Sequence, residues 1–307
     1  MHNQIICLMG PTASGKTALA IQIASQQDVE IISVDSAMVY RGMDIGTGKP
    51  TAAELQLAPH HLIDICDPST AYSVANFCND VTVLIEKSFA LGRTPLLVGG
   101  TMMYFKALQQ GLAVMPEADP VVRQEILDAA NATSWQELHK QLHIVDPISA
   151  KNIRNTDTQR IQRALEVYKI TGKPMSKLIA AQEPADLAMQ YEFINIAIDL
   201  PRSTLHARIA QRWQNMLQQG VIEEVAALYA RDDLTVDLPA LRSVGYRQIW
   251  HYLAGEYGKD LLQEKVLAAT RQLGKRQCTW LRSWPKLKLL DGNCENKYLA
   301  YCKLMLD

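Results

Sequence analysis

Short apolar runs alternate with amphipathic segments in the first third of the chain. The runs are rich in isoleucine, valine and leucine, whereas in the segments between them the apolar residues recur at helical spacing. The predicted strands are residues 4–9, 30–34, 61–65 and 95–98, and the predicted helices are 17–25 and 73–89. Apolar strands separated by helices are typical of a buried parallel sheet in an α/β protein.

The pattern changes between residues 116 and 191, where only helical segments are predicted. One of them, 157–171, ends clearly because Gly172 follows it. Strand character returns at 193–200, which we expect to be the last strand of the sheet. The predicted helices after this strand are 203–219, 239–252 and 259–284. We therefore predict an α/β core of residues 1–115 and 192–307, with an all-helical insertion of residues 116–191.

A phosphate-loop motif, G-x-x-x-x-G-K-[ST], lies between the first predicted strand and the first predicted helix. Its residues are Gly10, Pro11, Thr12, Ala13, Ser14, Gly15, Lys16 and Thr17. The backbone N–H groups of such a loop can hold a diphosphate, with Lys16 adding a positive charge and the Thr17 hydroxyl placed to bind Mg²⁺. The motif is typical of ATP-binding and other nucleotide-binding proteins, and it predicts a P-loop NTPase-like parallel sheet flanked by helices.

Asp35 follows directly on the second predicted strand. In open α/β sheets the carboxyl ends of the strands face the ligand crevice, so this carboxylate can act as a general base beside the diphosphate. The strand 95–98 ends in Gly99, Gly100 and Thr101 without a carboxylate, which argues against simple ATP or GTP hydrolysis. Phosphoryl transfer and alkyl transfer with a diphosphate leaving group both remain open at this point.

The formal net charge of -1 hides a strong asymmetry between the two halves of the chain. Residues 1–150 carry 8 Lys and Arg against 15 Asp and Glu, whereas residues 151–307 carry 23 against 17. A basic second half indicates a polyanionic partner such as a nucleic acid.

Basic residues and tryptophans cluster near the end of the last predicted helix. Between Thr270 and Leu290 the chain has six Lys or Arg and no acid, together with Trp280 and Trp284. Such a stretch suits a single-stranded RNA loop, although a basic surface helix with its tryptophans in the core explains the composition equally well. Arg208 and Arg212 lie four residues apart and therefore on one helix face, where they either reach the diphosphate or face solvent.

Several blocks of sequence, in this order, resemble the bacterial tRNA dimethylallyltransferases, also called tRNA isopentenyltransferases, of the IPP transferase family. The blocks are residues 10–17, 33–40, 42–47, 59–64, 97–101, 159–166, 241–247 and 270–280. The resemblance runs from the phosphate loop to Trp284.

The resemblance implies transfer of a dimethylallyl group from dimethylallyl diphosphate to N6 of adenosine 37 in tRNAs that read codons starting with U. N6-(dimethylallyl)adenosine and diphosphate are the implied products. It further implies that Asp35 is the general base, that residues 12–17 hold the diphosphate with Mg²⁺, and that Arg212 is the functional arginine. The target base would be flipped out of the anticodon loop, since it must reach a buried diphosphate. The implied enzyme is a cytoplasmic monomer.

The resemblance also implies contacts with the tRNA anticodon stem-loop in four segments and at two single residues. The first two segments are Asp35, Ser36, Ala37 and Met38, and Gln159, Arg160, Ile161, Gln162 and Arg163. The third is Arg242, Ser243, Val244, Gly245, Tyr246 and Arg247. The fourth is Lys275, Arg276, Gln277, Cys278, Thr279, Trp280, Leu281 and Arg282. The single residues are Thr101 and Arg123.

Two other classes of protein fit parts of the sequence. A small-molecule or nucleoside kinase would use the phosphate loop and Asp35 but leaves the basic stretches without a role, and a non-catalytic RNA-binding module leaves Asp35 without one. The start of the chain has neither a basic region nor a long apolar run, so we expect no signal peptide and no membrane span. The six cysteines have no zinc-site spacing and suit a reducing cytosol.

Overall fold

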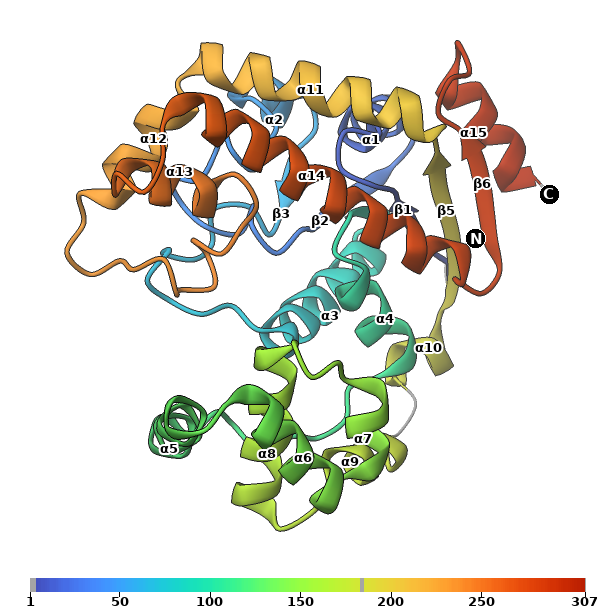
Figure 1. Cartoon of the computed structure of the whole chain (residues 1–307). Helices are drawn as coiled ribbons and strands as arrows, with labels where there is room; N and C mark the ends of the chain where they lie inside the picture. The colour runs from blue at the N-terminus through green and yellow to red at the C-terminus, as the bar shows by residue number, and fades with distance from the viewer. Residues whose placement is uncertain (1–3, 183–184, 307) are drawn as a thin grey trace. The chain divides into compact units, whose positions relative to one another are not determined.

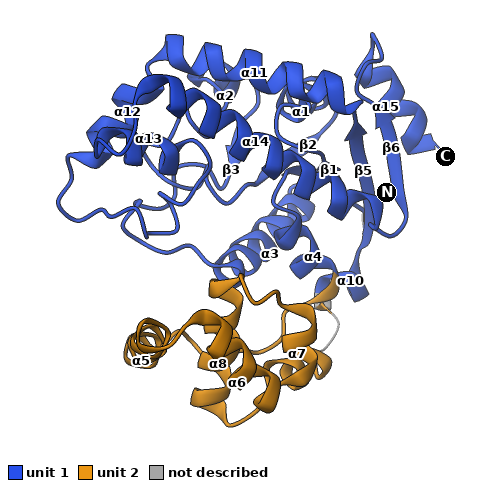
Figure 2. Ribbon diagram, viewed as in Figure 1, with its two compact units in different colours: residues 1–109, 187–307 blue, residues 110–186 orange. Residues whose placement is uncertain are grey.

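The computed structural model describes residues 4–182 and 185–306 (Figure 1). The chain divides into two compact units (Figure 2). The core unit comprises Met1–Gln109 and Leu187–Asp307, and the insertion unit comprises Gln110–Asp186. Each unit has its own hydrophobic core. No helix in the described ranges is both long and apolar enough to cross a lipid bilayer.

A six-stranded parallel sheet forms the centre of the core unit, which confirms the predicted α/β class. The strands are β1 (Gln4–Met9), β2 (Val29–Val34), β3 (His60–His61), β4 (Thr94–Gly99), β5 (Glu192–Asp199) and β6 (Leu287–Asp291). Their order across the sheet is β3-β2-β4-β1-β5-β6. Because all strands are parallel, the phosphate loop after β1 and the turns after β2 and β4 emerge at the same edge of the sheet.

Helices cover both faces of the sheet (Figure 1). The helices of the core unit are α1 (Lys16–Ala24), α2 (Ala52–Leu57), α3 (Val74–Ala90), α4 (Met102–Gln110), α10 (Asp186–Gln190), α11 (Arg202–Gln219), α12 (Val221–Tyr229), α13 (Tyr246–Leu253), α14 (Lys259–Arg282) and α15 (Lys297–Leu306). Ile5 and Cys7 of β1 pack in one cluster with residues of α3 and α4, and Ile6 and Leu8 pack on the other face with residues of α1 and α15. Burial on both faces explains why this strand is apolar throughout rather than alternating.

The insertion unit is helical in its described residues. Its helices are α5 (Pro120–Ala132), α6 (Trp135–Val145), α7 (Pro147–Asn152), α8 (Thr158–Thr171) and α9 (Met175–Ala180). Asp119 caps α5 by accepting hydrogen bonds from two backbone amides, and Asp157 caps α8. Ile126, Leu142 and Ile161 are among the residues that these helices bury together.

Three sequence predictions were wrong in extent or kind. The segment 193–200 is not the last strand, because β6 follows α14 and pairs with β5 at the sheet edge. The strand predicted at 61–65 ends at His61, because Leu62 and Asp64 have φ angles of 61° and 57°, which a strand does not allow. The helix predicted at 239–252 begins at Tyr246, and the residues before it form turns.

Candidate functional site

The phosphate loop connects β1 to α1, as the motif predicts. Lys16 stands at the first position of α1, and its Nζ donates to the Pro11 carbonyl at 2.8 Å and lies 3.5 Å from the Ser14 hydroxyl. Burial lowers the pKa of Lys16 from 10.5 to about 8; the Asp35 carboxylate opposes this shift and the Arg212 guanidinium adds to it. Lys16 is therefore electrostatically coupled to both predicted catalytic partners.

Asp35 begins a tight turn at the carboxyl end of β2. Its Oδ1 accepts hydrogen bonds from the amides of Ala37 at 2.8 Å and Met38 at 3.3 Å. The amide of the intervening Ser36 donates to the Thr101 hydroxyl at 3.1 Å. The turn after β2 is thus fixed to the turn after β4, and the orientation of the Asp35 carboxylate is fixed with it.

The strand β4 comes so close to β2 at this edge that its last residue must be glycine. A Cβ on Gly99 would lie 2.0 Å from the Val34 carbonyl oxygen. The neighbouring Gly100 carbonyl accepts a hydrogen bond from the Gln277 amide at 2.9 Å. The backbones of β2 and β4 are therefore in direct contact where the turns that carry the site begin.

Gln277 on α14 holds two loops of the site together. Its Oε1 accepts from the Thr12 amide at 2.9 Å, and its Nε2 donates to the Gly100 carbonyl. The side chain is buried at 8% exposure. The resemblance implies that Gln277 contacts tRNA, which stays a prediction; in this structure its side chain joins the phosphate loop to the turn after β4.

Both arginines of α11 point inward, so the interpretation that they face solvent is wrong. Arg212 donates from Nη2 to the Thr47 carbonyl at 2.8 Å, and Arg208 donates to the carbonyls of Ser14 and Gly292, each at 3.2 Å. Burial lowers the pKa of Arg212, and the nearby Asp35 carboxylate opposes this effect. Arg212 is the arginine coupled to Asp35 and Lys16, whereas Arg208 supports the backbone of the phosphate loop.

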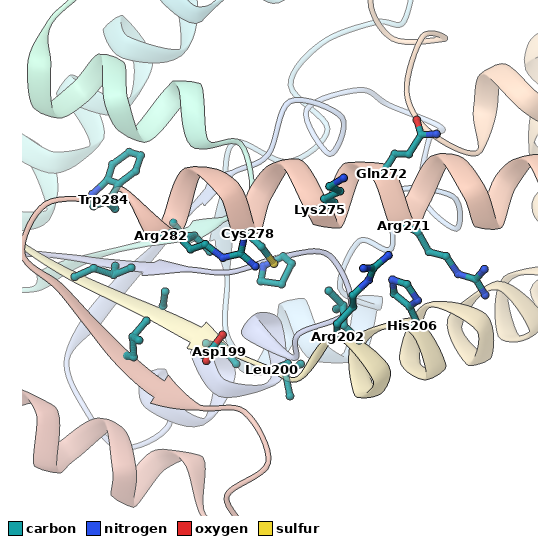
Figure 3. A pocket seen from close by; sticks show the side chains of 17 residues that line it. Asp199, Leu200, Arg202, His206, Arg271, Gln272, Lys275, Cys278, Arg282 and Trp284 are labelled. Carbon is teal, nitrogen blue, oxygen red and sulfur yellow. The ribbon is translucent and has the colours of Figure 1, made fainter.

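A cavity of about 1000 Å³ adjoins the phosphate loop at the carboxyl end of β5 (Figure 3). Its basic residues come from α11 and α14, and they are Arg202, His206, Arg271, Lys275 and Arg282. Asp199 and Pro11 also line it, together with leucines and Trp284. Partial burial lowers the pKa of His206, and the positive charges of Arg271 and Arg202 lower it further. The cavity is therefore rich in positive charge.

The residues of the segment 275–282 face different surroundings. Lys275, Cys278 and Arg282 line the cavity, because residues three or four apart share a helix face. Trp280 packs against the apolar cluster that contains residues of α3 and α4, and the Lys106 ammonium lies 5.7 Å from the centre of its ring. Trp284 packs edge-on against Phe105, with 6.4 Å between the two ring centres. Both tryptophans therefore pack against the core, and Trp284 also lines the cavity. Arg276 and Thr279 are exposed.

Among the residues predicted to contact tRNA, the side chains of Ile161, Tyr246, Gln277 and Leu281 are largely buried. Contact of these residues with tRNA stays a prediction. Arg242 and Arg247 flank the buried Tyr246 and are exposed.

Two of the predicted residues of the insertion unit, Arg123 and Arg163, surround one fully buried carboxylate, Glu166. Arg123 donates from Nε to Glu166 Oε1 at 2.9 Å, and Arg163 donates to Oε2 at 2.7 Å. These arginines hold the pKa of Glu166 below its ordinary value, although burial alone would raise it. Gln159 and Arg160 are exposed on α8.

Glu224 is a functional candidate that the sequence did not reveal. It lies on α12, and it accepts hydrogen bonds from backbone amides near Thr47, whose carbonyl contacts Arg212. One of two adjacent glutamates on a helix gives no sequence signal, since its partners are far away along the chain.

A phosphate loop, an acidic turn and a buried arginine at one edge of a parallel sheet define a phosphate-loop protein of the α/β class. A family model described as IPP transferase matches residues 38–284. The tRNA dimethylallyltransferase of Ralstonia pickettii (strain 12J) is 54% identical over 291 residues, which cover 93% of this chain and 90% of that protein. The chain therefore belongs to the IPP transferase family, whose activity is prenyl transfer to tRNA.

Solved structures agree with this assignment. The tRNA isopentenylpyrophosphate transferase from Bacillus halodurans is 34% identical with a TM-score of 0.72, and the match covers 99% of this chain and 95% of that one. A eukaryotic dimethylallyltransferase acting on tRNA is 26% identical with a TM-score of 0.77, and the match covers 94% of this chain and 74% of that one. The fold of the chain is thus similar to that of transferases from both bacteria and eukaryotes.

Proposed function

We propose that this enzyme transfers a dimethylallyl group from dimethylallyl diphosphate to N6 of adenosine 37, next to the anticodon of tRNAs that read codons starting with U. The bond between N6 and the allylic carbon forms as the bond between that carbon and the diphosphate oxygen breaks, giving N6-(dimethylallyl)adenosine and diphosphate. The observation that carries this proposal is that the phosphate loop after β1 and the Asp35 turn after β2 emerge at one edge of the sheet, where the charges of Lys16, Asp35 and Arg212 interact.

Asp35 is the proposed general base. An adenine amine is a weak nucleophile because its lone pair is delocalised into the ring, so removal of its proton during attack accelerates the reaction by about 10²–10⁴-fold. The Asp35 carboxylate can accept this proton because only its Oδ1 is used by the turn amides in the described structure. The Thr101 hydroxyl accepts a hydrogen bond from the Ser36 amide and so holds the backbone next to Asp35 in place.

The departing diphosphate is the group whose charge must be stabilised. We propose that the backbone amides of residues 12–17, the Lys16 ammonium and the Arg212 guanidinium bind its oxygens. Mg²⁺ prefers oxygen ligands, and the Thr17 hydroxyl in the first turn of α1 is the oxygen of the loop that would hold it. When bound there it would supply further positive charge to the diphosphate oxygens.

The target adenine must leave the stacked anticodon loop to reach a site at the sheet edge, so we propose that the base is flipped out. Exposed basic residues would hold the RNA backbone, since phosphate contacts provide most of the affinity. In the core unit the exposed candidates are Arg242, Arg247, Lys275, Arg276 and Arg282. In the insertion unit the exposed basic candidate is Arg160, with the polar Gln159 beside it.

The test is a transfer assay with radiolabelled dimethylallyl diphosphate and an unmodified tRNA that carries adenosines at positions 36, 37 and 38. We expect label in the RNA at position 37, its loss when Mg²⁺ is chelated, and its loss when the base at position 36 is changed. Unlabelled RNA together with ATP-dependent phosphorylation of a metabolite would establish a kinase instead.

A further inference from the structure

One carboxylate, on Glu224 of α12, binds an entire turn of the loop that follows β2. Its Oε2 accepts hydrogen bonds from the amides of Asp44 at 2.9 Å and Ile45 at 2.7 Å, and its Oε1 accepts from the Gly46 amide at 3.1 Å. The Tyr246 hydroxyl donates to the same Oε1 at 2.5 Å. Four donors that belong to two separate segments therefore converge on one side chain.

The residue directly after this turn contacts the diphosphate-binding arginine. The Thr47 carbonyl accepts from Arg212 Nη2 at 2.8 Å, and the Thr47 hydroxyl donates back to the Met43 carbonyl at 2.7 Å. The next residue, Gly48, lies directly against the guanidinium, because a Cβ there would lie 2.0 Å from Arg212 Nη2. The hydrogen bond from the Thr47 hydroxyl to Met43 links Thr47 to the turn that Glu224 binds.

A guanidinium has five N–H donors in a fixed plane. The bond from Nη2 to Thr47 holds one end of the guanidinium, and the remaining donors can face an anion. A shift of the Thr47 carbonyl would move this point of attachment relative to Lys16 and Asp35, the two groups to which the charge of Arg212 is coupled.

We propose that Glu224 is a positioning residue for prenyl diphosphate binding: it holds residues 44–46 so that the Thr47 carbonyl orients Arg212 toward the diphosphate. This inference rests on the proposed role of Arg212 in binding the diphosphate. Glu224 itself touches neither substrate nor reacting atoms.

The chemistry of the contact requires a carboxylate. Glu224 meets four donors, and a carboxylate only accepts hydrogen bonds, whereas a glutamine would direct its NH₂ group against a backbone N–H. The loop would still fold in such a variant, because Lys49 holds its other side through the Tyr40 carbonyl at 2.6 Å and Asp44 at 2.6 Å. The variant should therefore loosen the turn without unfolding the core.

The experiment compares Glu224→Gln with Glu223→Gln, which removes the same charge from the exposed neighbouring residue on the same helix. We expect Glu224→Gln to raise the KM for dimethylallyl diphosphate about tenfold while the KM for tRNA changes less than about twofold. Isothermal titration with inorganic diphosphate, without tRNA, should show the same loss of affinity. Glu223→Gln should match the wild-type enzyme in all three measurements.

A double-mutant cycle tests whether the effect passes through Arg212. In an Arg212→Ala background, Glu224→Gln should change diphosphate affinity by less than about twofold. An equal loss in both backgrounds, or no loss in the single variant, would overturn the positioning role. If Glu224→Gln does not fold, Tyr246→Phe, which removes one of the four donors, should give a smaller loss with the same dependence on Arg212, and a loss independent of Arg212 would overturn the proposal.

Failure of the proposed function gives a different result. If Arg212→Ala alone leaves diphosphate affinity unchanged, then Arg212 does not bind the diphosphate, and the inference fails with the role on which it rests. If Arg212→Ala weakens diphosphate binding but Glu224→Gln does not, only the positioning role of Glu224 is refuted.

Discussion

The lowered pKa of Lys16 predicts that diphosphate binding depends on pH near neutrality. Burial lowers this pKa from 10.5 to about 8, which corresponds to about 3 kcal/mol less favourable charging of the ammonium in the ligand-free protein. A lysine with a lowered pKa is charged below that value and neutral above it. Affinity for dimethylallyl diphosphate should therefore be near its maximum at pH 7 and fall as the pH rises through about 8.

The size of this effect follows from the population of the charged form. If only the ammonium form binds, Kd rises about tenfold between pH 7 and pH 9, because about nine-tenths of Lys16 is charged at pH 7 and about one-tenth at pH 9. A bound diphosphate favours the charged form and raises the pKa again. Binding at pH 9 should therefore take up a proton, whereas binding at pH 7 should take up almost none.

Isothermal titration without tRNA measures both the Kd and the number of protons taken up on binding. It must be run in two buffers of different ionisation enthalpy at each pH. Lys16→Arg is the matched control, since a guanidinium stays charged throughout this range and its Kd should not change with pH. A wild-type Kd that is constant from pH 7 to 9 would refute the argument. An equal pH dependence in Lys16→Arg would assign the titration to another group.

Three further predictions address other parts of the site. Asp35→Asn keeps the oxygen that accepts hydrogen bonds from the turn amides, so the turn and the tRNA affinity should persist. Turnover should fall about 10²–10⁴-fold, and unchanged turnover would exclude Asp35 as the general base. Gly99→Ala places a Cβ 2.0 Å from the Val34 carbonyl oxygen and should lower the free energy of unfolding by about 3 kcal/mol or more, which a wild-type denaturation curve would contradict. Changing Lys275 and Arg276 to alanine should weaken tRNA binding and reduce its salt slope by about 2; a loss confined to diphosphate affinity would contradict this.

The sequence predicts the elements whose signals are local. The strand β1 is recognisable because both of its faces are buried, and the end of α8 is recognisable because Gly172 follows it. The edge strand β6 was missed because only Leu290 of its five residues is buried and because most of it lies within the basic stretch between Thr270 and Leu290. Its pairing with β5 is a long-range contact that no local pattern records.

In the candidate site, too, residues with a local sequence signal were predicted and residues held by long-range contacts were not. The phosphate loop and Asp35 could be found because each lies in a contiguous motif next to a predicted strand. The contact of Gln277 with Thr12 joins residues 265 positions apart, and that of Glu224 with Ile45 joins residues 179 positions apart. Side chains that position the catalytic groups from such distances become visible only in three dimensions.

The pairing of β1 with β5 has a consequence for how the protein is made. Gln4 and Glu192 hydrogen-bond across these strands although they are 188 positions apart, and the insertion unit lies between them in sequence. The insertion unit is one continuous stretch whose core forms from neighbouring helices, so it can fold soon after it leaves the ribosome. The central strand of the sheet instead has one edge unpaired until β5 has been synthesised, and such high contact order makes closure of the sheet the slow step of folding.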